Sequence, residues 1–321
     1  MITLNIQEEA DSQWNDRLLK SDLATIYQTR EWGNLLHGNI RKPLFFQFLD
    51  EKGEIVGQVL IFLITNLKEN KLLNKLIITI PKLQKSLYSW SYGPIVFDNT
   101  RFDDIMNILI EYLKSQKYRV KGVGHPLLQN DISFLKSKIE INVWITFLIQ
   151  LTNSTEILYQ NIEKHSGRKN IERSIKRGVE IEEITYSSLS DYVDLLNDGK
   201  DEKQKTSLKD MQLTWNTLKP FGYSGMLAKK NDIPLSGLMF SFLQGHIIEA
   251  GVARSKEDQK NNFYSQDLIK WKIIEWGVKN KMRYYNLAGA NPNPTSKKES
   301  GILRYKQKWG GKQYDYWILK R

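Results

Sequence analysis

The pattern of apolar and polar residues occurs twice in the same order along this chain. In the first half it predicts a β-hairpin with a charged turn, then a strand, a helix with one apolar face and another strand, at residues 44–64, 90–97, 102–116 and 119–124. The second half predicts the same order at residues 221–243, 246–252, 263–280 and 283–288. Sequence identity between the halves is low, but the shared order of elements indicates an internal duplication.

Further elements complete the two halves. A strand at residues 2–6 and a helix at residues 12–19 precede the first hairpin, and a strand at residues 144–151 follows the first repeat. A chain of 321 residues is long enough for two domains. We therefore predict an α+β fold of two tandem domains, at residues 1–152 and 153–321, each a mixed sheet flanked by helices.

The C-terminal stretch predicts a strand, a loop, one short helix and a closing strand. Two prolines prevent the loop from being helical, and Ser296 and Glu299 have the spacing of a capping box. The helix should run from residue 297 to 308 and stop at Gly310-Gly311, before a strand at residues 313–319. This order puts Tyr305 and Lys306 close to the end of the strand at 284–290, and ligand sites often lie at strand ends.

Residues 157–179 join the halves and are rich in cations. Leu158 with Ile162 and Ile171 with Ile175 form apolar pairs four residues apart, and Gly178 has the position of a helix C-cap. We expect two amphipathic helices with a basic outer face. Such a face can bind RNA phosphates without reading sequence, although most charged runs are simply solvated.

The overall charge also favours an anionic partner. Lysine and arginine number 47 against 36 acidic residues, which gives a net charge of +11. This balance favours nucleic acid, nucleotide phosphates or an anionic membrane surface, and a solvated basic surface is the alternative. The chain has no cysteine, which excludes disulfides, thiolate nucleophiles and cysteine-ligated zinc.

Other features exclude several classes of protein. The acidic N-terminus has no apolar core of a signal peptide, and no apolar run approaches the ~20 residues of a membrane span, so we expect a soluble cytoplasmic protein. The four histidines are scattered, and no zinc-protease, nucleophile-elbow, Walker A or dinucleotide motif is present. We therefore predict no metal and no cofactor.

The C-terminal motifs resemble the signature of the FemABX family. The similar residues are Asn286-Leu-Ala-Gly289, the pair Tyr305-Lys306 and Trp309-Gly310-Gly311. FemABX proteins transfer an amino acid from aminoacyl-tRNA to an amine of a peptidoglycan precursor, and they consist of two tandem acetyltransferase-like (GNAT) domains. The resemblance implies this fold here, with the first domain on the acceptor side. The longest members insert a helical arm in the second domain, and no heptad segment of that length is present, so the chain resembles the compact form.

The resemblance also implies roles for individual residues. Lys306 matches the lysine tied to transfer, and Tyr305 accompanies it. Because the aminoacyl ester is already activated, the enzyme mainly positions an amine and stabilises an oxyanion, which a fixed cation can do. The alternative is an exposed Lys306 beside a core Tyr305. Arg304 can share this role, and the residues expected to contact tRNA are Arg168, Lys169, Arg173, Lys176, Arg177 and Lys308.

Four further residues are expected to contact substrate. Trp32 ends a segment that resembles the part of the family near its acceptor pocket, and Arg30 is a nearby cation. Leu36 stands where the family often has a phosphate-contacting lysine, so the acceptor can be another peptide or a small amine, and Trp32 can instead be a core anchor. Glu249 can accept a proton from a cationic amine or be an exposed strand residue, and Tyr264 opens the following helix.

The start of the helix near residue 263 bears on the donor. Acetyl-CoA-dependent GNAT enzymes bind pyrophosphate there with a glycine-rich turn, whereas residues 258–267 contain no glycine. This disfavours coenzyme A and favours aminoacyl-tRNA. Two alternatives stay open, an acyl-CoA-dependent N-acyltransferase and a non-catalytic, basic RNA-binding protein on the same fold.

Overall fold

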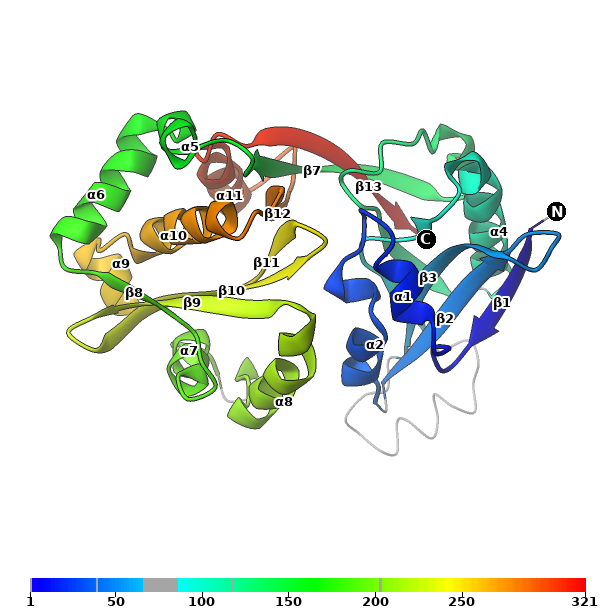
Figure 1. The fold of residues 1–321 in the computed structure, drawn as a ribbon, viewed down its shortest axis with the longest axis horizontal. Coiled ribbons are helices and arrows are strands. Elements are labelled where there is room, and N and C mark those ends of the chain that lie inside the picture. The colour runs from blue at the N-terminus through cyan, green and yellow to red at the C-terminus, as the bar shows by residue number, and fades with distance from the viewer. Residues whose placement is uncertain (1, 39, 66–85, 117, 202–203) are drawn as a thin grey trace. The chain divides into compact units, whose positions relative to one another are not determined.

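The computed structural model describes residues 2–38, 40–65, 86–116, 118–201 and 204–321 (Figure 1). The chain divides into unit 1, Met1–Trp144 with Asp315–Arg321, and unit 2, Ile145–Tyr314. This division differs from the predicted domains 1–152 and 153–321. The last residues belong to unit 1 because Ile318–Lys320 pair with the antiparallel strand that contains Val123.

Unit 1 is built on one mixed sheet. Its strand order is β1-β2-β3-β4-β6-β13, with β5 beside β3, and β4 and β6 are the parallel neighbours. The predicted hairpin at residues 44–64 is confirmed by the antiparallel pairing of β2 and β3. The strands are β1 (Thr3–Gln7), β2 (Arg41–Leu49), β3 (Ile55–Ile64), β4 (Leu87–Trp90), β5 (Ile95–Val96), β6 (Arg119–Val123) and β13 (Lys312–Lys320).

The predicted strand at residues 90–97 is wrong in one respect, because β4 and β5 are separate. Tyr92 has a left-handed backbone with φ of 56°, and Pro94 has no N–H to donate to a neighbouring strand. The helices of unit 1 are α1 (Trp14–Leu18), α2 (Arg30–Leu36) and α4 (Phe102–Ser115), with short 3-10 turns η1 (Ile26–Gln28), η3 (Asn99–Arg101) and η4 (Ser133–Leu135).

The main helix of unit 1, α4, forms where the apolar spacing predicts it. Phe102, Ile105, Leu109 and Leu113 recur every three or four residues, and all are buried in the core. Asp103 and Asp104 lie in its first turn, where the helix dipole favours negative charge.

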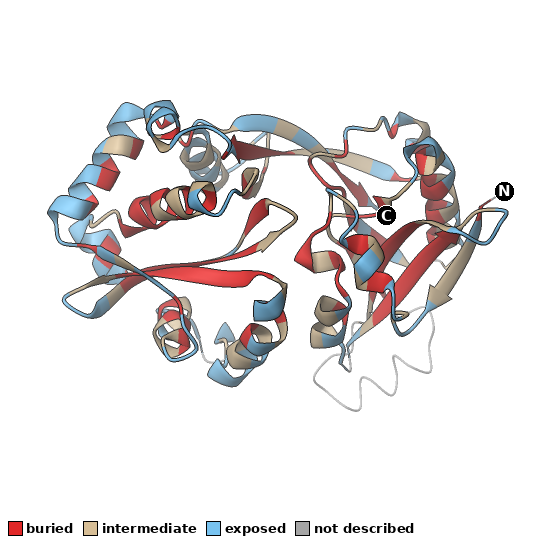
Figure 2. Ribbon diagram, viewed as in Figure 1, coloured by how far each residue is buried: buried red, intermediate tan, exposed pale blue. Residues whose placement is uncertain are grey.

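Unit 2 repeats this arrangement. Its strand order is β7-β12-β11-β10-β9-β8, and β11 and β12 are the parallel neighbours. Helix α10 packs on β9 and β10, and most of its residues are buried (red in Figure 2). The strands are β7 (Glu140–Gln150), β8 (Glu180–Glu183), β9 (Tyr223–Lys230), β10 (Ile233–Leu243), β11 (His246–Arg254) and β12 (Tyr284–Ala290).

The helices of unit 2 confirm several predictions. The expected pair near 157–179 is α5 and α6, and the residues between them form a π-helical turn, η5 (Lys164–Arg168). Gly178 has the expected left-handed φ, at 72°, but Ile175 is 57% exposed, so the second apolar pair is not a core contact. The helices are α5 (Thr155–Asn161), α6 (Lys169–Lys176), α7 (Leu189–Asn197), α8 (Leu208–Leu218), α9 (Lys256–Asn261), α10 (Ser265–Lys279) and α11 (Lys297–Gln307), with a 3-10 turn η7 (Lys219–Phe221).

Both units therefore contain a hairpin, a strand, a helix and a strand parallel to the first, which confirms the predicted duplication. In unit 1 these are β2-β3, β4, α4 and β6, and in unit 2 they are β9-β10, β11, α10 and β12. Among the helices that the structure describes, none is long and apolar enough to cross a membrane.

Candidate active site in the second unit

The candidate site begins where two parallel strands of unit 2 separate. β11 and β12 pair over His246–Ile248 and Tyr284–Asn286. Farther along, β11 pairs with β10, and β12 pairs with β7 on its other side. A cavity of about 740 Å³ lies at this gap, a volume typical of ligand pockets. Its polar lining comes from β11, α10 and α11, namely Glu249, Arg254, Gln266, Lys270, Lys298, Tyr305 and Lys306.

Asn286 shapes the end of β12 that borders this cavity. Its side-chain oxygen accepts the N–H of Ala288 at 2.9 Å and the hydroxyl of Thr146 at 2.6 Å. Ala288 has a left-handed φ of 60°, and the strand register shifts between Asn286 and Gly289. The carbonyl oxygens of Ala288 and Gly289 lie at the edge of the cavity as acceptors, and that of Ala288 also lies 2.9 Å from the Thr146 hydroxyl.

Lys306 of α11 binds these carbonyl groups. Its Nζ donates to the Ala288 oxygen at 2.9 Å and to the Gly289 oxygen at 2.8 Å. Burial lowers the pKa of Lys306 from 10.5 to about 8, with the Glu249 carboxylate opposing and the Lys270 ammonium adding to this shift. An ammonium has three donors, so one N–H is left for a ligand in the cavity. The alternative of an exposed Lys306 is therefore wrong.

Glu249 forms a buried ion pair beside this lysine. Its carboxylate contacts the Lys270 ammonium and also accepts the hydroxyl of Tyr285 at 2.7 Å. The Glu249 side chain is 9% exposed and that of Lys270 is 3% exposed, so the prediction of an exposed strand residue is wrong. Because the pair is neutral as a unit, Glu249 does not present an unbalanced negative charge to the cavity.

Tyr305 lies between this cavity and a second one of about 430 Å³. Its hydroxyl group is buried and forms no hydrogen bond with the described part of the chain. Burial, together with the Asp267 and Glu249 carboxylates, raises the pKa of Tyr305 well above its usual value of 10.0. The residue is therefore a neutral hydroxyl at physiological pH. Tyr264, predicted to contact substrate, lines the second cavity with Arg254, Gln266 and Lys308.

Lys308 does not belong to the exposed basic face. Its ammonium lies 2.6 Å from the Asp267 carboxylate and 2.9 Å from the Ser166 carbonyl oxygen. The side chains of Lys308 and Asp267 are 8% and 5% exposed, and Asn170 also donates to Asp267 at 2.8 Å. This geometry corrects the expectation of a tRNA-contacting cation, because the charge of Lys308 is already neutralised in the interior.

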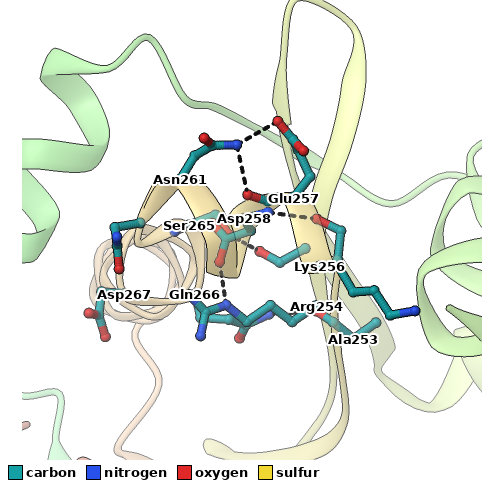
Figure 3. A network of polar contacts seen from close by, with 12 residues as sticks. Ala253, Arg254, Lys256, Glu257, Asp258, Asn261, Ser265, Gln266 and Asp267 are labelled. Atoms are coloured by element: carbon teal, nitrogen blue, oxygen red, sulfur yellow. Dashed lines mark hydrogen bonds and ion pairs between the residues drawn. The ribbon is translucent and has the colours of Figure 1, made fainter. Parts of the chain in front are cut away.

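A further buried carboxylate, Asp258 of α9, lies beside the start of α10 (Figure 3). Asp258 is fully buried, accepts the backbone N–H of Ser265 at 3.1 Å and forms an ion pair with Arg254. Asn262 and Tyr264, the residues that lead into the helix, have left-handed φ angles of 53° and 57°. The backbone turn that glycine normally permits is thus formed without glycine.

Helix α6 carries the predicted basic face. Lys169, Arg173 and Lys176 are exposed and fall at spacings of four and three residues, so they form one stripe. The guanidinium groups of Arg173 and Arg177 lie 5.8 and 5.6 Å from the centre of the Tyr264 ring. The stripe therefore leads to the ring that lines the second cavity. Arg168 is half-buried, and its Nε has no hydrogen-bond partner among the described residues.

The remaining predicted residues do not line these two cavities. Arg304 is exposed on α11, and Arg30 is exposed and pairs with Glu31. In unit 1, Trp32 packs edge-on against Tyr27 at 5.0 Å and lines a separate cavity of about 160 Å³. Leu36 and the exposed Arg41 also line that cavity, so Trp32 is both an anchor and part of a pocket wall.

The Trp309-Gly310-Gly311 motif has a structural role. Trp309 is buried in the core of unit 2, and Gly310 has a left-handed φ of 70° after α11. A Cβ at Gly310 would lie 2.5 Å from the carbonyl oxygen of Asn161. These residues fix the end of α11 against α5 and thereby position Tyr305 and Lys306.

Sequence reasoning missed Lys270, Arg254 and Asp258. Lys270 was detectable as a charge amid Leu268, Ile269 and Trp271 in a helix that is buried on nearly every side. Within the described residues, no group of three histidine, aspartate or glutamate side chains is arranged to hold a metal ion.

Comparison with solved structures identifies the fold. FemX superposes with a TM-score of 0.67 at 13% identity, covering 98% of this chain and 96% of FemX. The tandem GNAT protein of the clavulanic acid pathway gives 0.59 at 10% identity, covering 100% and 98% of the two chains. L-PGS from Bacillus licheniformis gives 0.55 at 10% identity, covering 98% and 93%. The chain has the duplicated GNAT fold of FemX.

No protein-family model and no curated protein sequence matches the chain. The similarity is therefore one of three-dimensional structure, and the chemistry has to be argued from the residues of the site.

Proposed function

We propose that this protein is an acyltransferase that moves an amino acid from aminoacyl-tRNA to an amine. The observation that carries the proposal is Lys306, whose partly buried ammonium is fixed on two backbone carbonyls at the cavity between β11 and β12. The acceptor is an amine of a peptidoglycan precursor or of another peptide or small molecule. The fold shared with FemX supports the same class of reaction.

The chemistry requires little beyond positioning and charge. The acceptor nitrogen attacks the ester carbonyl and forms the new N–C bond, and the carbonyl oxygen becomes an oxyanion. Collapse breaks the C–O bond to the ribose, and the proton lost by nitrogen passes to the ribose oxygen. The unused N–H of Lys306 donates to the oxyanion, and a buried cation stabilises it more than a solvated one would.

The basic stripe on α6 supports RNA as the carrier of the donor. Lys169, Arg173 and Lys176 present three exposed cations in line, a spacing that suits a phosphate backbone. Tyr264 stands where the stripe meets the second cavity and offers a ring on which a terminal base can stack. An acyl-CoA donor is the alternative reaction on this fold, and a non-catalytic RNA-binding protein is the alternative without chemistry.

The test is single-turnover transfer from charged tRNA to an amine by three proteins, the wild type, Lys306→Met and Lys306→Arg. The Met variant should bind charged tRNA normally and lose transfer by about 100-fold or more, as for loss of one oxyanion donor. Normal binding without transfer separates an enzyme from a binding protein. Full activity of the Met variant would overturn the assignment of Lys306.

The pH dependence sharpens this test. Because the pKa of Lys306 is about 8, the wild type loses the cation between about pH 7 and 9, whereas arginine stays charged. The ratio of wild-type to Arg-variant rate cancels the ionisation of the acceptor amine. We expect this ratio to fall about tenfold from pH 7 to 9, because at one pH unit above its pKa only about a tenth of Lys306 is still protonated. A ratio that rises with pH would make Lys306 a base.

A further inference from the structure

The start of α10 is an anion site that the protein fills with its own carboxylate. A helix of 15 residues presents unpaired N–H groups and a partial positive charge at its N-terminus, which attracts anions such as phosphate. Here the fully buried Asp258 accepts the N–H of Ser265 at 3.1 Å. The same carboxylate binds the Nε of Arg254 (Figure 3).

The shape of the turn does not exclude a phosphate. Asn262 and Tyr264 take left-handed φ angles of 53° and 57°, so the backbone reverses as a glycine-rich turn would. Arg254 and Tyr264 line the adjacent cavity of about 430 Å³, which is large enough for a pyrophosphate group. Lack of glycine thus does not by itself exclude an anion from this turn.

Carboxylates of the protein occupy the donors at this helix end. Asp258 neutralises Arg254, and its backbone N–H is itself bound to the Ser255 hydroxyl at 3.0 Å, which holds the carboxylate in place. Asp267, in the first turn of α10, adds a second carboxylate whose partners are Lys308 and Asn170. An incoming phosphate would find the Ser265 N–H and Arg254 already bound to Asp258, and Lys308 already bound to Asp267, so these residues leave it no free donor.

We propose that Asp258 is a specificity-determining residue, an internal anion that keeps donors bearing a pyrophosphate group, such as coenzyme A thioesters and nucleotides, out of the cavity at α10. This proposal concerns which ligands are rejected, and it goes beyond the proposed transfer reaction. An ester on a ribose needs no anion at this helix end, so rejection does not impede an aminoacyl-tRNA donor.

The experiment measures binding of inorganic pyrophosphate and coenzyme A by isothermal titration at constant ionic strength. Asp258→Asn keeps the size of the side chain but removes its charge and releases Arg254. The wild type should show no binding at millimolar ligand, and the Asn variant should bind at least tenfold more tightly than the wild-type limit. An Asn variant that binds no better than the wild type, or a wild type that binds equally well, would overturn the proposal.

Two further variants separate charge from loosening. Ser255→Ala removes the hydroxyl that holds the Asp258 backbone but leaves every charge, so it should gain no binding, and an equal gain there would contradict the proposal. Arg254→Gln combined with Asp258→Asn should lose most of the gain. If Asp258→Asn does not fold, Asp258→Ser carries the same test, because it also removes the carboxylate and releases Arg254. Its melting temperature should rise with pyrophosphate, and that of the wild type should not.

The variant outcomes distinguish this proposal from the proposed function. Failure of the Asn variant to gain pyrophosphate binding contradicts the role of Asp258 alone, whereas absence of transfer from charged tRNA contradicts the reaction alone.

Discussion

Replacing Lys306 with methionine should make the protein more stable at neutral pH while abolishing transfer. Burial lowers the pKa of Lys306 from 10.5 to about 8. That difference, 10.5 minus about 8, corresponds to about 3.4 kcal/mol at 1.36 kcal/mol per pKa unit. The variant loses two hydrogen bonds to Ala288 and Gly289, each worth about 1 kcal/mol. The free energy of unfolding should therefore rise by about 1–2 kcal/mol at pH 7.

The sign of the pH dependence follows from proton binding. Between about pH 8 and 10.5, Lys306 binds more protons in the unfolded wild type than in the folded protein. The free energy of unfolding of the wild type therefore rises with pH over this range as Lys306 loses its proton. Methionine does not titrate, and the advantage of the variant should disappear by about pH 10.

Urea denaturation followed by tryptophan fluorescence at pH 7, 8.5 and 10 measures both effects. Lys297→Met is the matched control, because Lys297 is exposed on the same helix, and its difference from the wild type should not change with pH. A Lys306→Met protein that is less stable than the wild type at pH 7, or a difference independent of pH, would refute this reasoning.

Three other substitutions test separate parts of the account. Glu249→Gln leaves the Lys270 charge buried without its anion and should lower the free energy of unfolding by about 3–5 kcal/mol. Adding Lys270→Met to this variant should restore most of the lost stability. A loss below about 1 kcal/mol for Glu249→Gln would show that the pair is weakly coupled. Charge reversal at Lys169 and Lys176 should weaken tRNA binding and reduce the slope of log binding constant against log salt concentration by about two. Charge reversal at the exposed Lys52 should change neither quantity. Unaltered tRNA binding by the Lys169 and Lys176 variant would exclude α6 as the RNA surface. Gly310→Ala should lower the melting temperature, because the left-handed backbone costs an alanine about 1–2 kcal/mol and its Cβ meets Asn161. Gly301→Ala is the control: its Cβ has open space, so it should raise the free energy of unfolding by about 0.5–1 kcal/mol. Equal effects of the two substitutions would contradict the role of Gly310.

The order of the elements was predictable because it depends on local spacing. The apolar faces of α4 and the capping box Ser296–Glu299 at α11 are patterns within a few residues, and both are present as expected. The repeat of a hairpin, strand, helix and strand was visible for the same reason. The predicted boundary differed from the division of the chain because the return of β13 to unit 1 is a long-range pairing.

The charges of the site were less predictable, because their partners are distant in sequence. Glu249 and Lys270 are on different elements, and periodicity gives the face of a helix without naming the partner. Lys308 follows a helix rich in cations, yet it points to Asp267 in the interior. The motif match found Tyr305 and Lys306 but could not show that Trp309-Gly310-Gly311 serves to position them.

The turn before α10 shows a different limit of sequence reasoning. Lack of glycine in residues 258–267 predicts no phosphate-binding turn, but Asn262 and Tyr264 adopt the backbone angles that glycine favours. The carboxylate of Asp258 provides the stronger argument against a donor that bears a pyrophosphate group, and it depends on a contact that only the folded chain shows.

The most direct test of the aminoacyl-tRNA donor is binding of the purified protein to charged tRNA and to acetyl-CoA across a range of salt concentrations. We predict that charged tRNA binds with an affinity that falls steeply between about 50 and 200 mM salt, as expected for contacts to several phosphates, and that acetyl-CoA does not bind. Binding of acetyl-CoA with no preference for charged tRNA would contradict the account and assign the cavity between β11 and β12 to an acyl-CoA-dependent acyltransferase.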